Sequence, residues 1–264
     1  MFLGIGFTFI VPALQTRNLW LCSKRAQEPF PKIGLESRTG WPRDSEPVPM
    51  IVPGWGGAIR GLLTLIQEVF ELQALLKVAK ISPPFVLVGQ SLGAMNVRLF
   101  TQQDSGEVAG IVLVDPADEN SMLFMVGTKR WMKLRDQARG RKVPPPRERG
   151  SPSTGYNPEE DFLGDEAQLL YLSRQRNPQP FGDRPLFVLA AGKRPPPPGM
   201  TEDSYRDIRR AIDQDRVDAA HLSRNSKFVL DVNSGHNIQR DDPQAVAEAV
   251  TEVVEAVKSH TKLK

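Results

Sequence analysis

The chain of 264 residues is 40% hydrophobic and 25% charged, an ordinary composition for a globular protein, and we expect one large domain with an insertion. Its net charge of +3 is too small to indicate nucleic acid or an anionic membrane as the main partner. Its single cysteine excludes an intramolecular disulfide framework and any CxxC metal or redox site.

The first 14 residues are apolar, but they carry no basic n-region and are shorter than the roughly 20 residues that a bilayer-spanning helix needs. We interpret them as a buried strand or a hydrophobic arm, with a signal-peptide h-region as the alternative. No other run approaches membrane length, so we expect no integral membrane domain. A cytoplasmic location is favoured, while residues 1–14 leave secretion or membrane association open.

The chain then alternates between two kinds of segment, after a polar, irregular stretch over 15–47. Short apolar runs predict buried strands at 50–52, 85–88, 110–114, 185–190 and 227–232. Helical periodicity predicts helices at 58–79, 92–103, 202–223 and 243–259. Asp242 is typical of an N-cap for the last of these, and Pro243 of its first position. The alternation predicts a doubly wound α/β fold with a mostly parallel sheet covered on both faces.

One interval, 117–180, breaks this alternation. It contains Pro144–Pro146, a cluster of basic residues over 129–149 and a further helical pattern at about 164–174. An insertion between two core strands lies above their carboxyl ends, where ligands bind, so the functional interpretation is a lid. The alternative is a solvated loop that is disordered over 137–160.

The segment Gly89-Gln-Ser-Leu-Gly93 has the pattern Gly-x-Ser-x-Gly, directly after a predicted strand and before a predicted helix. This is the setting of a nucleophile elbow, in which Ser91 occupies a strained turn and side chains at Gly89 and Gly93 would collide with neighbouring elements. The amide of Leu92, at the helix N-terminus, is the candidate oxyanion donor. The alternative is a glycine-flanked serine in an ordinary tight turn.

Of the three histidines, only His236 follows a predicted strand, where a loop at the strand's carboxyl end shares its side of the sheet with Ser91. Gly235 lets that loop turn the imidazole inward. A surface loop histidine is the alternative. His221, within a predicted helix, and His260, in a charged tail, are interpreted as structural or solvated.

A serine–histidine pair needs a carboxylate that holds the imidazole tautomer. Asp115 ends the strand that follows the elbow helix and is our first candidate. Asp203 and Glu202, which follow the strand at 185–190 at some distance, are the alternatives. If either of these is the acid, Asp115 serves only to cap or orient the elbow loops.

Four segments resemble the α/β-hydrolase superfamily in order and spacing, and with their helices they cover about 60–258. They are Gly89–Gly93, Gly110–Pro116, Gly182–Gly192 and Ser234–Pro243. The resemblance implies Ser91 as nucleophile, His236 as base, and a hydrolase domain over 48–264 with a cap at about 117–180. Some members place the acid where Asp115 stands.

The N-terminal third departs from the family pattern, and we treat 1–47 as degenerate or truncated. The family's His-Gly oxyanion loop is matched by Pro49-Met-Ile-Val-Pro-Gly-Trp-Gly-Gly57, with Pro53 in place of the histidine. The amide of Trp55 is the candidate second oxyanion donor. The segment 37–47 resembles another loop of the family, and using it would displace this assignment.

The first functional hypothesis is therefore a serine hydrolase of the carboxylic-ester type, acting on a small or lipid-like acyl substrate. The second is a catalytically impaired member that keeps the fold for binding, and the third is a lipid-facing enzyme anchored by residues 1–14. We expect no cofactor and no metal, because no cluster has ligand spacing and Gly4-x-Gly6 lacks the third glycine of a dinucleotide motif.

Overall fold

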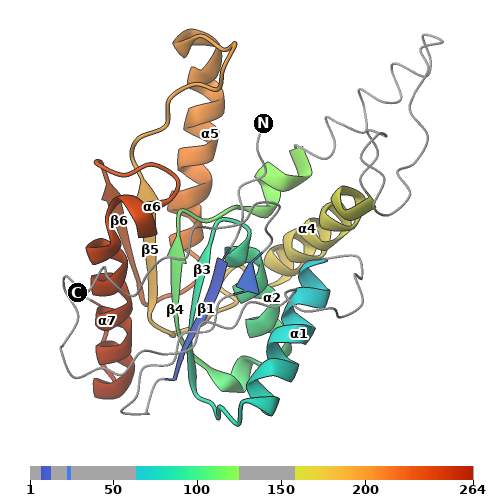
Figure 1. The fold of residues 1–264 in the computed structure, drawn as a ribbon, viewed down its shortest axis with the longest axis vertical. Coiled ribbons are helices and arrows are strands. Elements are labelled where there is room, and N and C mark those ends of the chain that lie inside the picture. Colours follow the sequence, from blue (N-terminus) through green and yellow to red (C-terminus); the bar gives the residue numbers. More distant parts are fainter. Residues whose placement is uncertain (1–6, 13–22, 25–63, 125–157, 264) are drawn as a thin grey trace.

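The computed structural model describes residues 7–12, 23–24, 64–124 and 158–263 (Figure 1). They contain a six-stranded sheet in the order β2-β1-β3-β4-β5-β6. The strands are β1 (Phe7–Pro12), β2 (Ser23–Lys24), β3 (Phe85–Gln90), β4 (Val108–Val114), β5 (Leu186–Ala191) and β6 (Ser226–Asp231). The predicted strands at 85–88, 110–114, 185–190 and 227–232 are thus present, and the one predicted at 50–52 lies outside the described residues.

Strands β3 to β6 pair in parallel, which confirms the mostly parallel sheet. The exception is β1, which runs antiparallel to β3 with Phe7 opposite Gln90 and Pro12 opposite Phe85, and β2 pairs antiparallel with β1. The apolar N-terminus therefore contributes a strand at Phe7–Pro12. A division of the chain at residue 47 would separate this strand from the sheet to which it is hydrogen-bonded.

Helices cover the two faces of the sheet, with α7 on one side and α1 and α2 on the other (Figure 1). The helices are α1 (Leu65–Val78), α2 (Gly93–Gln103), α4 (Pro158–Arg176), α5 (Glu202–Ala220), α6 (Ile238–Asp241) and α7 (Pro243–Ser259), with a short 3-10 helix at Ser105–Glu107. A further helical turn occupies 119–124.

Capping side chains set where two of these helices begin. Helix α1 begins at Leu65 rather than at residue 58, because Thr64 adopts an extended conformation and accepts a hydrogen bond from the amide of Gln67. Helix α7 begins as predicted, with Asp242 accepting a hydrogen bond of 3.0 Å from the amide of Ala245.

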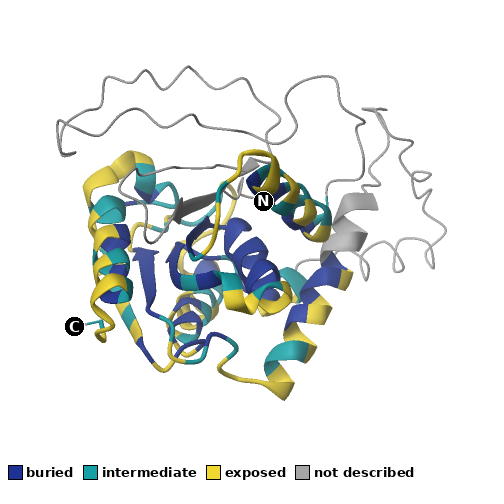
Figure 2. Cartoon of the chain, turned by 90° about the horizontal axis from the view of Figure 1, so that it is seen from below, coloured by how far each residue is buried: buried dark blue, intermediate teal, exposed yellow. Residues whose placement is uncertain are grey.

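Every residue of β3 is buried, and the sheet interior in Figure 2 is coloured accordingly. Because successive side chains of a strand point to opposite faces, the core has two layers. Phe85 and Leu87 pack toward the α1–α2 side, together with Met95 and Phe100, whereas Val86 and Val88 pack toward α7. The central strand is thereby held from both sides, which fixes the position of whatever follows its carboxyl end.

Helix α4, in the described part of the 117–180 insertion, packs against α1 and α2. Ala167 and Leu170 on this helix are fully buried. Residues 125–157 of the insertion lie outside the described residues, so a lid there stays a prediction. None of the helices described is both long enough and apolar enough to cross a membrane.

Candidate active site

Ser91 lies in a sharp turn between β3 and α2 and has a φ of 54°, a left-handed conformation that is strained for a residue with a side chain. Gly89 is required by close packing, because a Cβ there would lie 2.4 Å from the carbonyl oxygen of Gly93. The amide of Ser91 donates to the carbonyl of Val114 at 3.1 Å, which ties the turn to the end of β4. The turn thus has the geometry expected of a nucleophile elbow.

His236 lies in the loop between β6 and α6, and its ring nitrogens face two different partners. Nε2 is 3.0 Å from the Oγ of Ser91, and Nδ1 is 2.6 Å from Oδ2 of Asp115. Since a carboxylate accepts hydrogen bonds, the proton belongs on Nδ1, and Nε2 is left to accept from the serine hydroxyl.

Asp115 follows β4 directly, is fully buried and has a φ of 41°. Burial alone would raise the pKa of its carboxyl group, but the hydrogen bond with His236 and the charge of Arg216 outweigh this effect and hold the pKa well below its usual range. The carboxylate beside the imidazole is therefore ionised at neutral pH.

The other two acid candidates do not reach His236. Glu202 and Asp203 lie in the first turn of α5, are exposed, and pair with Arg209 and Arg206. The expectation that either folds back to complete the triad is not met, because the helix that begins at Glu202 carries both side chains away. Of the three predicted candidates, the structure brings only Asp115 to the histidine.

The α/β-hydrolase family model matches residues 36–249 of the chain. The chain belongs to the α/β-hydrolase family. This confirms the predicted family and fold, and family membership supports a hydrolase.

Among curated proteins, the α/β-hydrolase chain is similar to the uncharacterised protein YqjL of Bacillus subtilis, with 28% identity over 202 residues, 76% of this chain and 68% of the relative. Among solved structures it is similar to a probable hydrolytic enzyme of Pseudomonas aeruginosa, at 15% identity and a TM-score of 0.42, covering 74% of this chain and 70% of the other. A putative lipase of Acinetobacter baumannii gives 16% identity and a TM-score of 0.43, with coverages of 80% and 76%.

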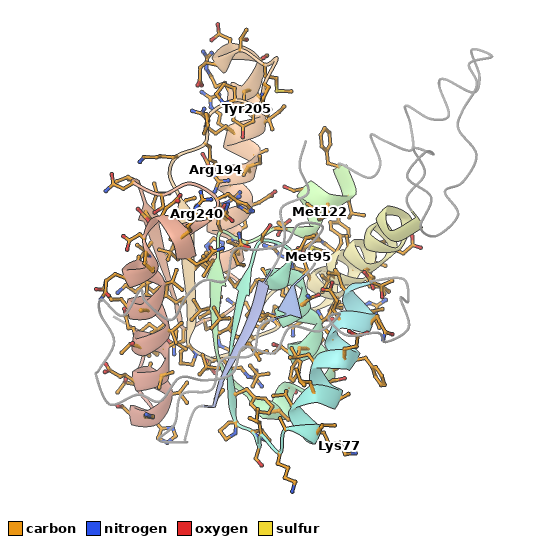
Figure 3. The ribbon with its side chains drawn as sticks, in the orientation of Figure 1. Lys77, Met95, Met122, Arg194, Tyr205 and Arg240 are labelled. Carbon is orange, nitrogen blue, oxygen red and sulfur yellow. The ribbon has the colours of Figure 1, made fainter. Side chains whose placement is uncertain are left out.

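Two arginines that sequence reasoning missed also contact Asp115. Arg216 on α5 donates from Nε to Oδ1 of Asp115 at 2.7 Å and from Nη2 to Oδ2 at 3.3 Å. Arg194, labelled in Figure 3, donates from Nη2 to Oδ1. One sequence feature pointed to Arg216: it lies four residues after Ile212, on the helix face predicted to be buried.

Of the two predicted oxyanion donors, the amides of Leu92 and Trp55, only that of Leu92 lies among the described residues. Leu92 follows the serine at the N-terminus of α2, and among the backbone hydrogen bonds of the described residues its amide donates none. Its place at the helix N-terminus keeps it a candidate donor to a substrate oxygen. Trp55, the predicted second donor, lies outside the described residues.

Gln90, which precedes the serine, forms a side-chain hydrogen bond to the backbone of His236. Its Nε2 donates to the backbone oxygen of His236 at 3.1 Å and lies 3.3 Å from the ring Nε2. Because the backbone oxygen can only accept, the nitrogen of the Gln90 amide must face it. Gln90 is buried, so this contact restrains the imidazole next to Ser91.

A buried cluster of charges lies behind the elbow. Arg98 of α2 forms a bidentate ion pair with Glu119, in which Nη2 donates to Oε1 at 2.8 Å and Nη1 donates to Oε2. Nη1 of Arg174 on α4 lies 3.1 Å from Oδ2 of Asp118. Burial, then the neighbouring Glu119 carboxylate, raises the pKa of Asp118 to about 7, although Arg174 is close. Arg98 is the main partner that lowers the pKa of Glu119 against the effect of its burial.

The described residues show no candidate metal site, and the hollow found in the structure lies away from Ser91. No group of three potential metal ligands occurs among the residues that the structure describes. An open hollow of about 540 Å³ is lined by Lys77, Lys80, Phe85 and Asp104, among others. Phe85 begins β3 whereas Ser91 follows its end, and Lys77 lies at the far end of the molecule in Figure 3, so the hollow is remote from the triad.

Proposed function

We propose that this α/β-hydrolase is a serine hydrolase that cleaves an ester-like acyl bond through an acyl-enzyme. The observation that carries the proposal is the continuous chain of contacts from Ser91 Oγ to His236 Nε2, at 3.0 Å, and from His236 Nδ1 to Asp115, at 2.6 Å. Both distances are within hydrogen-bond reach, as general base catalysis requires.

In this mechanism His236 Nε2 takes the hydroxyl proton of Ser91 while Oγ forms a bond to the acyl carbon. The negative charge on the substrate oxygen is stabilised by the amide of Leu92 and, as a further prediction, by that of Trp55. The imidazolium then gives its proton to the leaving alcohol as the carbon–oxygen bond breaks. Water then gives a proton to His236 Nε2 and attacks the acyl carbon. The acyl carbon–Oγ bond breaks, the imidazolium returns the proton to Ser91 Oγ, and the carboxylic acid is released.

The substrate class is a small or lipid-like acyl ester that enters above the carboxyl ends of the strands. The predicted cap at about 117–180 would shape the pocket there. The proposed mechanism needs no metal or cofactor in any step.

The test is labelling by a fluorophosphonate probe, together with hydrolysis of short-chain and long-chain p-nitrophenyl esters. We expect labelling and turnover in the unmodified protein and the loss of both in Ser91→Ala. The matched control is Ser82→Ala, which removes an exposed serine before β3 and should change neither. A folded protein that neither labels nor turns over any ester would contradict the proposal and favour the binding-scaffold alternative.

A further inference from the structure

The carboxylate of Asp115 accepts more hydrogen bonds than positioning one imidazole requires. Oδ1 receives the amide of Ala191 at 3.0 Å, Nε of Arg216 at 2.7 Å and Nη2 of Arg194. Oδ2 receives Nη2 of Arg216 at 3.3 Å and contacts Nδ1 of His236 at 2.6 Å. Two guanidinium groups therefore share the anion that faces the histidine.

The two arginines come from different elements, and both are held in place. Arg216 is buried on α5, where its Nη1 also donates to the carbonyl of Ile212 at 2.7 Å. Arg194 is in the segment after β5; its Nε lies 3.3 Å from Oδ1 of Asp213, and its backbone oxygen accepts from Arg209 at 2.6 Å. Neither guanidinium is a mobile surface charge, so both act on the carboxylate steadily.

This arrangement changes what the acid does to the base. A lone buried carboxylate next to an imidazole favours the imidazolium, because the opposite charge is close. Two cations on the same carboxylate offset that attraction and also repel a positive imidazole. A base that is already protonated cannot accept the proton of Ser91, so a weaker attraction keeps the site competent at lower pH.

We propose that Arg194 and Arg216 are positioning residues that fix the ionised Asp115 carboxylate and limit its stabilisation of protonated His236. The inference deepens the proposed function and rests on the same triad. It makes the working pH range of the site a property of α5 and of the segment after β5, neither of which contributes a triad member.

Asp241 and Arg98, on elements next to His236, have partners of their own. Asp241 of α6 accepts from the amide of Gly235 at 2.9 Å and is paired with Arg240. Arg98 of α2 is paired with Glu119. Among the residues that the structure describes, the charged groups on the elements around the histidine include Asp115, Lys193, Arg194, Asp213, Arg216, Asp231, Arg240 and Asp241, with the Arg98–Glu119 pair on α2 and the turn after β4.

The experiment follows the ring signals of His236 by NMR as pH is varied, in the unmodified protein, Arg194→Gln, Arg194→Lys and Arg216→Gln. His236→Asn assigns the signals against those of the other two histidines. We expect the titration midpoint of the ring to move to higher pH in Arg194→Gln, because one nearby cation is lost. Arg194→Lys keeps the charge and should stay near the unmodified protein. The acid limb of kcat/KM should move with the midpoint.

Arg194→Gln decides the matter even if Arg216→Gln fails to fold, because Arg194 lies outside the helices and Arg216 still neutralises Asp115. An unchanged or lowered midpoint in folded Arg194→Gln would overturn the inference. Absence of ester turnover with a shifted midpoint would defeat the proposed function and leave the inference standing. Ester turnover that depends on Ser91, together with an unchanged midpoint in Arg194→Gln, would support the proposed function and overturn the inference.

Discussion

The backbone amide of Ala117 donates a hydrogen bond to the carbonyl oxygen of Ser91, at 3.0 Å. Since the amide of Ser91 donates to Val114, both backbone polar groups of the serine are satisfied by the chain at the end of β4. Asp115 lies between those two partners. The same short segment therefore fixes the backbone of the proposed nucleophile and carries the carboxylate that faces the proposed base.

Replacing Asp115 by Asn should lower kcat/KM for an ester by roughly 10³- to 10⁴-fold, because an amide no longer holds the imidazole tautomer or stabilises its charge. Steady-state kinetics, with circular dichroism to verify folding, measure the loss. Asp203→Asn and Glu202→Gln are the matched controls and should stay within about twofold of the unmodified rate. A large loss in either control with little loss in Asp115→Asn would reassign the acid.

Gly89→Ala should destabilise the protein by about 1–3 kcal/mol, because the new Cβ meets the carbonyl oxygen of Gly93 at 2.4 Å and the backbone must shift. Urea unfolding gives the change in free energy. Gly106→Ala is the control, since a Cβ there meets nothing within 4 Å. Equal stability of the two variants would show that the turn between β3 and α2 is looser than described.

Glu166→Ala should cost about 1–3 kcal/mol of unfolding free energy. The buried carboxylate of Glu166 on α4 accepts from the amides of Leu65 and Ile66, at 2.8 and 2.9 Å, and so caps the N-terminus of α1. Thermal or urea unfolding measures the loss, with Glu255→Ala on the exposed side of α7 as control. If both variants unfold alike, α4 does not hold α1 in this way.

Asp118→Asn should stabilise the protein more at pH 8 than at pH 5, relative to the unmodified chain. The folded-state pKa of Asp118 is raised from 3.8 to about 7, so its contribution to stability is present below pH 3.8 and is lost as pH rises through about 7. The amide has no such loss. Urea unfolding at several pH values tests the sign, and exposed Asp207→Asn should show no comparable trend.

Several features of the site could be predicted because they follow from local sequence. Ser91, Asp115 and His236 each come directly after a strand or in the loop that follows one, and parallel strands place their carboxyl ends on the same side of a sheet. An apolar run and the residue after it are visible without any knowledge of tertiary contacts. Local sequence does not decide which of Asp115, Glu202 and Asp203 faces the histidine, because the answer depends on where α5 begins.

What could not be predicted depends on contacts between distant segments. Arg216 meets Asp115 because α5, which packs against β5 and β6, brings this side chain to the carboxylate at the end of β4. Glu166 meets Leu65 because α4 lies against α1. The direction of β1 is another example. An apolar run predicts a strand, but the side and sense of its pairing with β3 depend on the path of the intervening chain.

The antiparallel pairing of β1 has a consequence beyond the geometry of the triad. With β4 on one side and β1 on the other, β3 has its backbone hydrogen-bonded along its whole length from Phe85 to Gln90. If Phe7–Pro12 came away, the unpaired amides and carbonyls of β3 would form an open edge, a template for strands of other molecules. Damage to this N-terminal strand would therefore be seen first as self-association and aggregation, before any change in chemistry at Ser91.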